Sequence, residues 1–497
     1  MEAMVMREMR KGPGPGRRRP RALFSHLVPP LVMLPLFLLS LLSPVSSWAQ
    51  ARWGQLSRTV LSNGLTLIVQ EYRQVPLARL LLLLPGGASL EGSGKAGLAY
   101  MTAELLLKGT TQRNARQIAE EIDRLGGDLS ASASYDYCAV TLEVLSSDLG
   151  RGLDLMMDCL LHPSFPAQEL ERKRSEALAA ISRSQEEPEA IAEKRFRSLL
   201  YGSHPYGSPL GGTRDSLTAI TREDVLSFYR QTFWPDQAIL VAVGDFRAEE
   251  MRAELEARFS SWSRGGSALP LLSTAPPPRL QGRRVVVVDK PDVTQARILM
   301  GNSGPPRDTP HFFPLSLANA VLGRMGFSSR LMDRLRSREG LTYHVESYFS
   351  MGKAGGSFVI ETSTRTEKVG SAISAILEEV RSFREKGLRA EELTKAKTYR
   401  KGIYYIALQS MESLVAQLAE IEFYGLPKDL IESYRERVDR VSLEEANEAA
   451  RQFFPSEDLL IVILGNASPI EDQLRDPEGR GWLHDLAEVK IEKFERE

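Results

Sequence analysis

Histidine is scarce in this chain, with six residues in a length of 497. One lies in the N-terminal segment. The other five, at positions 162, 204, 311, 344 and 484, include no two at a spacing that would share one face of a helix. Zinc sites on helices depend on such pairs of imidazoles one turn apart. The sequence therefore excludes a zinc site built on paired helical histidines, and we expect each histidine to lie at the surface or in a loop.

Cysteine is rarer still, with only Cys138 and Cys159. Cys138 alternates with Val140, Leu142 and Val144 on what should be the buried face of a strand, and Cys159 lies in an apolar helical run. A helix packed on that face could bring the two sulfurs together in an oxidising compartment. We expect instead two separate thiols in the core.

Net charge is almost absent, because 63 basic and 64 acidic side chains leave −1 at neutral pH. Nothing in this balance predicts binding to nucleic acid or to an anionic membrane. A long apolar run occurs once, from Leu27 to Val45, after a cluster of arginines and before Ala49-Gln50-Ala51. This order of features is typical of an export signal. The alternative is an uncleaved anchor, which would be the chain's one contact with a membrane.

The most informative stretch runs from Gly97 to Thr110 and reads G-L-A-Y-M-T-A-E-L-L-L-K-G-T. It resembles the metal-binding helix of the pitrilysin/insulinase family of zinc peptidases, which reads G-L-A-H-x-x-E-H-x-x-x-K-G-T. In that motif two His one helical turn apart bind Zn²⁺, and the Glu is the general base. The resemblance places Tyr100 and Glu104 at the two His positions and Ala103 at the position of the Glu. The frame of the motif is retained and its chemistry is lost.

The family's third zinc ligand is a Glu in a helix that reads E-R-x-x-x-V-x-x-E-E-I. This chain has the matching frame from Glu171 to Ile181, with Ala179-Ala180 in place of the Glu pair. Ala180 is therefore the third degenerate metal position, and Glu104 alone would be a weak ligand. We expect no metal cofactor in this chain and no peptidase activity from the chain alone.

The chain also repeats itself, which predicts its architecture. Residues 220–244 and 441–465 each read as a helix, an aromatic-aromatic-Pro turn and an apolar strand that ends in Gly. Thr221 and Ser442 each precede an acidic pair, which is typical of an N-cap. A long helix also corresponds in the two halves, Ala167 to Arg183 and Ala390 to Ile406. The predicted fold class is α+β, with two homologous domains that each have a mostly antiparallel sheet covered by helices.

A breaker-rich stretch with Gly265-Gly266 and Pro276-Pro277-Pro278 separates the two repeats. We predict a signal peptide at 1–51, an N-terminal peptidase-like domain at 52–262, a linker at 263–282, a C-terminal peptidase-like domain at 283–470 and a charged tail at 471–497. For the tail, a solvated helix or a frayed end is the default expectation. In the family, two such domains form half of a peptidase chamber.

The segment from Ser328 to Tyr343 resembles the family's S-R-L…R-x-x-x-G-L-x-Y segment. In active members this Arg and Tyr bind substrate and stabilise the oxyanion formed when water attacks the scissile carbonyl. A guanidinium and a phenol are donors that suit developing negative charge. The resemblance places these roles on Arg336 and Tyr343. The alternative is an Arg on a solvated helix end and a Tyr that starts a strand.

The stretch from Gly126 to Tyr137 parallels the family's substrate-binding edge strand, G-G-x-x-N-A-x-T-x-x-D-x-T. The small side chains of Ser130, Ala131, Ser132 and Ala133 would let an extended peptide add as a strand through backbone hydrogen bonds. Ser130 replaces the usual Asn and Ala133 the usual Thr, which puts specific side-chain contacts in doubt. A plain edge strand is the alternative.

Some bacterial members of this family are two-chain enzymes, in which one subunit brings H-x-x-E-H and the other brings the Arg/Tyr pair. This chain resembles the second kind. The first hypothesis is a periplasmic, non-zinc subunit that closes the chamber over peptide or unfolded protein, with Arg336 and Tyr343 acting in trans and Zn²⁺ held by a homologous partner. The second is a catalytically dead scaffolding or peptide-binding protein, like the family's core subunits in the mitochondrial respiratory complex. The third is an autonomous peptidase with a rebuilt zinc site.

Overall fold

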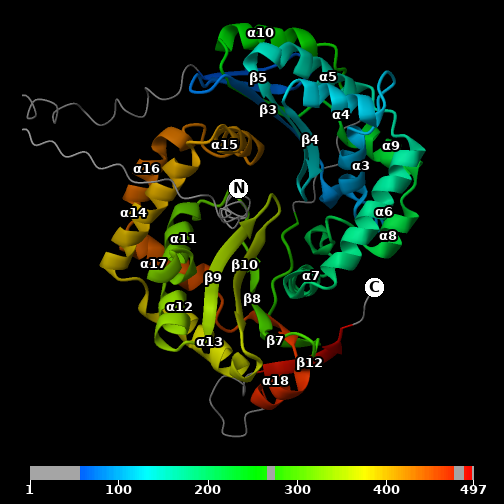
Figure 1. Ribbon diagram of the computed structural model, residues 1–497. Coiled ribbons are helices and arrows are strands. Elements are labelled where there is room, and N and C mark those ends of the chain that lie inside the picture. Colours follow the sequence, from blue (N-terminus) through cyan, green and yellow to red (C-terminus); the bar gives the residue numbers. More distant parts are fainter. Residues whose placement is uncertain (1–55, 266–274, 475–485, 495–497) are drawn as a thin grey trace, which may run out of the picture.

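The computed structural model describes residues 56–265, 275–474 and 486–494. The predicted export signal and parts of the predicted linker and tail lie outside these ranges. Two six-stranded sheets form the framework, one in each half of the chain (Figure 1). We call residues 56–265 the first half and the described residues from 275 onward the second half.

The first sheet has the strand order β1-β2-β6-β3-β5-β4. Its neighbours pair antiparallel except for β2 and β6, which are parallel. Central strands such as β6 are buried along their whole length, as their unbroken apolar sequence predicts. The strands are β1 (Leu56–Val60), β2 (Thr66–Glu71), β3 (Leu77–Pro85), β4 (Asp128–Ala133), β5 (Tyr137–Leu145) and β6 (Ile239–Gly244).

The second sheet repeats this plan in the order β12-β7-β11-β8-β10-β9. Its parallel pairs are β7 with β11 and β7 with β12, and the remaining pairs are antiparallel. The predicted fold of two homologous α+β domains with mostly antiparallel sheets is confirmed. The strands are β7 (Arg283–Asp289), β8 (Ala296–Gly304), β9 (Thr342–Met351), β10 (Gly356–Thr364), β11 (Leu459–Gly465) and β12 (Leu486–Lys493).

Helices cover both sheets, and the duplicated caps form as predicted. Thr221 accepts a hydrogen bond from the Asp224 nitrogen at the start of α9, and Ser442 accepts one from the Glu445 nitrogen at the start of α17. Helices α5, α10 and α4 lie over the first sheet on its outer side (Figure 1). The longer helices are α3 (Leu98–Leu106), α4 (Ala115–Arg124), α5 (Leu149–Leu161), α6 (Ala167–Ser184), α7 (Pro188–Tyr201), α9 (Arg222–Thr232), α10 (Ala248–Phe259), α11 (Phe312–Asn319), α13 (Val369–Lys386), α14 (Ala390–Ala407), α15 (Met411–Phe423), α16 (Leu430–Arg440), α17 (Leu443–Phe453) and α18 (Ala467–Leu474).

Each half also sends one helix across to the sheet of the other half. Helix α7 packs on β8 and β11, and its Phe196 lies in one core cluster with Val462 of the second sheet. Helix α15 packs on β3 and β6, and its Leu414 lies in one core cluster with Val241 of the first sheet. Burying a side chain of this size contributes about 1.5–3 kcal/mol. The exchange therefore ties the two halves into one unit, and the predicted domain boundaries do not separate the two cores in space.

The C-terminal tail differs from the default expectation of a solvated helix or frayed end. Its residues Leu486–Lys493 form β12, which pairs in parallel with β7 and completes the second sheet. In the first sheet the equivalent outer place beside β2 is taken by β1, which comes from the other end of the described chain. The expectation was wrong because a short strand of alternating charge resembles a solvated tail until its partner strand is known.

Both cysteines are free and buried, so the prediction of two separate core thiols is confirmed. Cys138 lies in β5 and Cys159 in α5, within the same core cluster. Within the described ranges, no helix combines the length and the apolar character needed to cross a membrane.

Candidate functional site

Helix α3 carries the degenerate metal motif, and the half-buried acid Glu91 binds the backbone at its start. Gly97 precedes the helix with a left-handed φ of 91°. The carboxylate of Glu91 accepts hydrogen bonds from the backbone nitrogens of Gly97 at 3.1 Å and Ala99 at 2.8 Å. These nitrogens would otherwise lack partners in the first helical turn. Burial raises the pKa of Glu91 to about 7, although the same hydrogen bonds oppose that rise.

The three degenerate positions of α3, at Tyr100, Ala103 and Glu104, provide few groups that could bind a metal ion. Ala103, at the position of the family's general base, is 1% exposed and has no polar side-chain atom. Tyr100 is half-buried, and burial together with the nearby charge of Glu104 raises the pKa of its phenol. Side chains at these positions therefore supply one protonated phenol and one carboxylate.

That carboxylate already has a cationic partner from the neighbouring helix. Lys173 of α6 places its Nζ 2.7 Å from Glu104 Oε2 and 3.1 Å from Glu176 Oε2. Ala180, at the position of the family's third zinc ligand, is exposed on the same helix as Lys173. In the parts of the chain that the structure describes, no three His, Cys, Asp or Glu side chains are grouped so that they could hold a metal ion. A phenol and an ion-paired carboxylate do not fit Zn²⁺, which takes three or four nitrogen, sulfur or oxygen ligands from a protein.

The predicted Arg/Tyr pair comes together in the second half. Arg336 lies in the irregular helical turn Asp333–Arg338, and Tyr343 is the second residue of β9. The guanidinium lies over the Tyr343 ring, 4.2 Å from its centroid, and its Nη1 donates a hydrogen bond of 2.9 Å to the Tyr343 carbonyl oxygen. The Tyr343 side chain is 79% exposed. Gly340 allows this close return of the chain, because its φ of 59° suits glycine.

A third side chain completes this arrangement, and sequence reasoning missed it. The guanidinium of Arg336 also lies over the ring of Phe327, 4.5 Å from its centroid, so that it contacts both rings. Phe327 is 66% exposed, and the turn that carries it also contains Gly326 at a φ of 54°. A large apolar residue beside glycine in a polar turn was the available signal. Such cation–π contacts contribute about 0.5–1 kcal/mol each at exposed sites, so the two rings restrict where the guanidinium points.

The predicted peptide-binding strand is β4, and it is the terminal strand of the first sheet. Its residues alternate between exposed and half-buried, with Ser130 and Ser132 on the exposed side and Ala131 and Ala133 on the half-buried side. The Ser130 hydroxyl is turned to its own strand, where it donates to Asp128 Oδ2 at 3.1 Å. Helix α3 packs against β4, so the degenerate motif and the edge strand are neighbours. The edge position is as predicted, and peptide binding stays a prediction.

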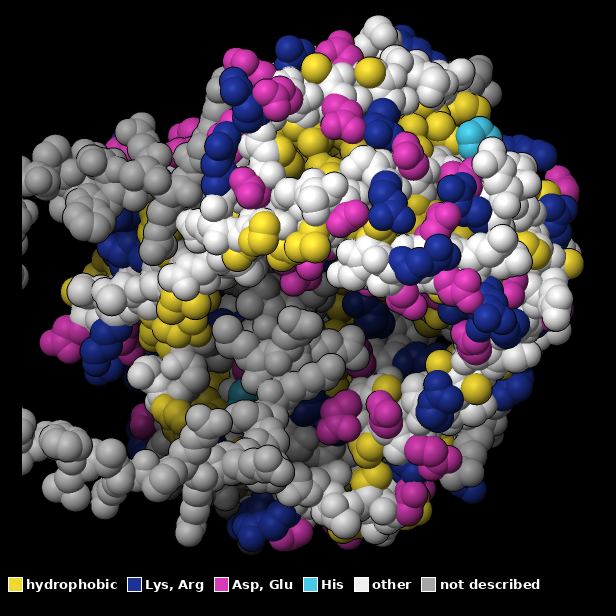
Figure 2. Space-filling model, turned by 45° about the horizontal axis from the view of Figure 1, so that its top comes forward, with side chains coloured by type: hydrophobic (Ala, Val, Ile, Leu, Met, Phe, Trp, Pro, Cys, Tyr) yellow, Lys and Arg dark blue, Asp and Glu magenta, His cyan; other side chains and the backbone are white. Residues whose placement is uncertain are grey.

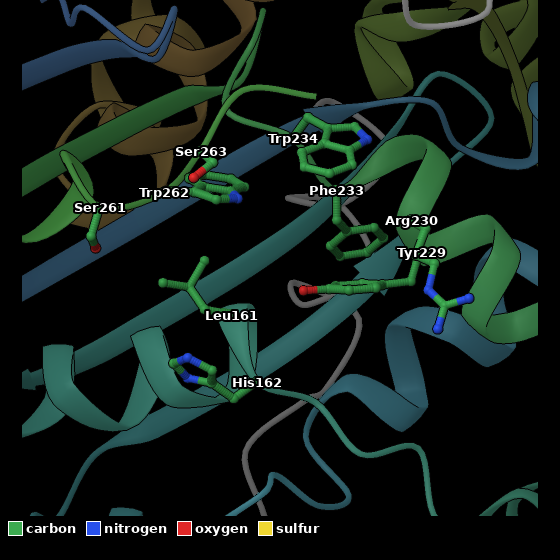
Figure 3. Close-up of a pocket in the computed structure, with 9 residues that line it drawn as sticks. All are labelled: Leu161, His162, Tyr229, Arg230, Phe233, Trp234, Ser261, Trp262 and Ser263. Atoms are coloured by element: carbon green, nitrogen blue, oxygen red, sulfur yellow. The ribbon is translucent and has the colours of Figure 1, made fainter. Parts of the chain in front are cut away.

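The space-filling view shows a hollow between the two halves, with basic side chains inside it (Figure 2). A separate surface pocket of about 400 Å³ lies in the first half, between the ends of α5 and α9 (Figure 3). Aromatic side chains dominate that pocket, and none of the predicted site residues lines it. Its lining residues are Leu161, His162, Tyr229, Arg230, Phe233, Trp234, Ser261, Trp262 and Ser263.

Comparison with protein families gives two adjoining matches. The family described as insulinase (peptidase family M16) matches residues 67–214, and the peptidase M16 inactive domain matches residues 219–399. An uncharacterized zinc protease of Mycobacterium leprae is 30% identical over 405 residues, which cover 81% of this chain and 90% of that relative. The uncharacterized zinc protease YmxG of Bacillus subtilis is 25% identical over 409 residues, which cover 82% of this chain and 98% of that relative.

Solved structures agree with the sequence matches. A peptidase M16 inactive domain from Pseudomonas fluorescens superposes with a TM-score of 0.78 at 26% identity and covers 83% of this chain and 98% of its own. A protease from Helicobacter pylori superposes with a TM-score of 0.75 at 21% identity, which shows a shared fold, and covers 82% of this chain and 99% of its own. By sequence and by fold, the chain belongs to the insulinase family of peptidases, family M16.

Proposed function

We propose that this chain is the non-zinc subunit of a two-chain peptidase and that it supplies Arg336 and Tyr343 to an active site built by a homologous zinc-binding subunit. One contrast carries the proposal. The zinc-ligand and general-base positions on α3 hold a phenol, a methyl group and an ion-paired carboxylate, whereas Arg336 and Tyr343 are both present and in contact, and Tyr343 is exposed. This contrast favours a subunit that still takes part in catalysis through Arg336 and Tyr343 over a scaffold without any catalytic residue.

The geometry of the pair suits work on another molecule. The Arg336 guanidinium contacts the rings of Phe327 and Tyr343, and the Tyr343 side chain is largely exposed. Both groups donate hydrogen bonds, so both can stabilise an oxyanion that forms in a partner's site. Donors that are already oriented lose little freedom when they bind the transition state.

The substrate class follows from the edge strand. Among the residues that the structure describes, no strand pairs with the outer edge of β4, and the small side chains of β4 leave room for an extended chain beside it. Backbone hydrogen bonds to this edge would select extended peptide or unfolded protein with little sequence preference. The two halves would then form one wall of a chamber that the partner closes.

The proposed location is the periplasm, reached through the predicted export signal in residues 1–51. A chain that keeps this segment as an anchor would act from the membrane surface. Zinc is assigned to the partner's H-x-x-E-H site.

The test is a peptidase assay of this chain alone, of a zinc-binding sibling alone and of the two mixed, each with zinc. We expect activity only in the mixture and its loss with Arg336→Ala or Tyr343→Phe. The matched control is Arg338→Ala, because Arg338 is an exposed arginine of the same turn that pairs with Asp333. A stable complex without activity would indicate the scaffolding function instead. Zinc-dependent activity from this chain alone would overturn the proposal.

A further inference from the structure

Helices α3 and α6 carry the positions that bind the metal in zinc-binding relatives, and in this chain an ion pair joins them. Lys173 reaches from α6 to Glu104 on α3 at 2.7 Å and to Glu176 on its own helix at 3.1 Å. The Lys173 side chain is only 14% exposed, and that of Glu104 is 28% exposed. Removing one partner of such a partly enclosed ion pair costs more stability than removing one partner of an exposed pair, because it leaves a poorly solvated charge behind.

Lys173 is protonated at neutral pH. Burial lowers the pKa of Lys173, but the hydrogen bonds to Glu104 and Glu176 outweigh burial and raise it above its ordinary value. The phenol of Tyr100, at the first degenerate ligand position, lies close enough to Lys173, Glu104 and Glu176 for their charges to shift its pKa. A permanent positive charge therefore occupies the side of α3 on which a divalent cation would have to bind.

We infer that the Lys173 ammonium replaces the link between α3 and α6 that a metal makes in zinc-binding relatives. We also infer that its positive charge prevents divalent cations from binding at the degenerate metal site. The inference does not depend on the proposed partner. It explains how α3 and α6 are joined at these positions without a metal. It also predicts that restoring metal ligands alone is insufficient to restore a metal site.

The first test measures the cross-link through thermal unfolding of the full chain. Lys173→Met leaves Glu104 without its partner, and we expect the melting temperature to fall by about 2–4 °C. The matched control is Lys395→Met, at an exposed lysine of helix α14. In a double-mutant cycle, adding Glu104→Gln to Lys173→Met should cost less than the sum of the two single changes. A Lys173→Met protein that melts like the Lys395→Met control, with additive changes in the cycle, would overturn the cross-link.

The second test measures exclusion of the cation through zinc content after equilibrium dialysis. Tyr100→His, Glu104→His and Ala180→Glu together place ligands at all three degenerate positions. We expect this variant to bind zinc at least about tenfold more weakly than the same variant with Lys173→Met added, because the neighbouring ammonium repels Zn²⁺. Circular dichroism establishes that both proteins are folded before dialysis. Equal zinc affinity in the two folded variants would overturn the exclusion, and if either fails to fold, the first test decides the inference.

Discussion

Asp136, buried in the turn between β4 and β5, accepts a hydrogen bond of 2.8 Å from the backbone nitrogen of Lys353 in the turn between β9 and β10. The phenol of Tyr206 donates to the same carboxylate, and that of Tyr424 approaches it at 3.4 Å. Tyr206 in turn accepts a hydrogen bond from the Ala354 nitrogen at 3.1 Å. One carboxylate of the first half thus binds donors from both halves.

We therefore expect Asp136→Ala to destabilise the whole protein. The substitution leaves the Lys353 nitrogen and the Tyr206 phenol without their acceptor in a buried place, and each such loss costs about 1–3 kcal/mol. The free energy of unfolding in urea should fall by about 3 kcal/mol in total. The matched control is Asp123→Ala, at an exposed acid of helix α4, which should change the stability little. Equal effects of the two substitutions would show that the Asp136 contacts contribute nothing net.

The fold could be predicted where the signal was local. Thr221 and Ser442 act through hydrogen bonds to residues three positions along, so their caps are visible in the sequence. The crossing of α7 and α15 was not visible, because an amphipathic helix shows that it has an apolar face and not which sheet that face meets. Strand β12 was missed for the same reason, since its partner β7 is about 200 residues away.

The candidate site, like the fold, could be predicted only where its residues belong to a local sequence pattern. A family motif identifies Arg336 and Tyr343 by their spacing, and the structure brings them together. Phe327 and Lys173 belong to no such motif, and their roles depend on side-chain geometry. Cation–π contacts and ion pairs between separate elements leave no periodic trace in the sequence.

The contacts of Arg336 with two aromatic rings predict that activity requires a flat guanidinium at this position and not only a positive charge. Arg336→Lys retains the charge but loses the flat guanidinium that contacts both rings and its fixed fork of donors. We expect the peptidase activity of the proposed two-chain enzyme to fall at least about tenfold in kcat. Phe327→Ala should lower kcat less, by about two- to fivefold, because one of the two rings remains. Wild-type kcat in the Arg336→Lys enzyme would show that charge alone is required.

Glu91 predicts that the stability of the protein falls as the pH rises from about 4.5 to about 7. Burial raises its folded-state pKa to about 7 from an ordinary 4.5, so its favourable contribution is fully present below about pH 4.5 and is lost as the pH rises through 7. Between about pH 5.5 and 8.5 the wild type should lose about 2 kcal/mol of unfolding free energy through this group. Glu91→Gln should remove that part of the pH dependence, and Glu120→Gln, at an exposed acid, should retain it. Parallel pH profiles of wild type and Glu91→Gln would contradict the assignment.

The two cysteines predict an unreactive pair of thiols. Burial raises the pKa of both Cys138 and Cys159 to about 12, so at pH 8 only about one in ten thousand is a thiolate. We expect iodoacetamide to leave the native protein unmodified and to add two groups after unfolding without reductant, as read by mass spectrometry. A native protein that gains groups only after reduction would show that the two sulfurs pair.

The C-terminal strand should stabilise the second sheet through one well-formed ion pair. Arg195 of α7 donates from Nε to Glu492 Oε2 at 2.7 Å and from Nη2 to Oε1 at 2.5 Å, which fixes β12 to the helix that crosses from the first half. Two parallel bonds to one carboxylate are stronger than a single contact. A double-mutant cycle of Arg195→Ala and Glu492→Ala should therefore give a coupling of about 1 kcal/mol in urea unfolding. The matched control is the exposed pair Arg116 and Glu120 within α4, whose coupling should be about 0.3 kcal/mol. Equal couplings for the two pairs would show that β12 is held by its backbone pairing with β7 alone.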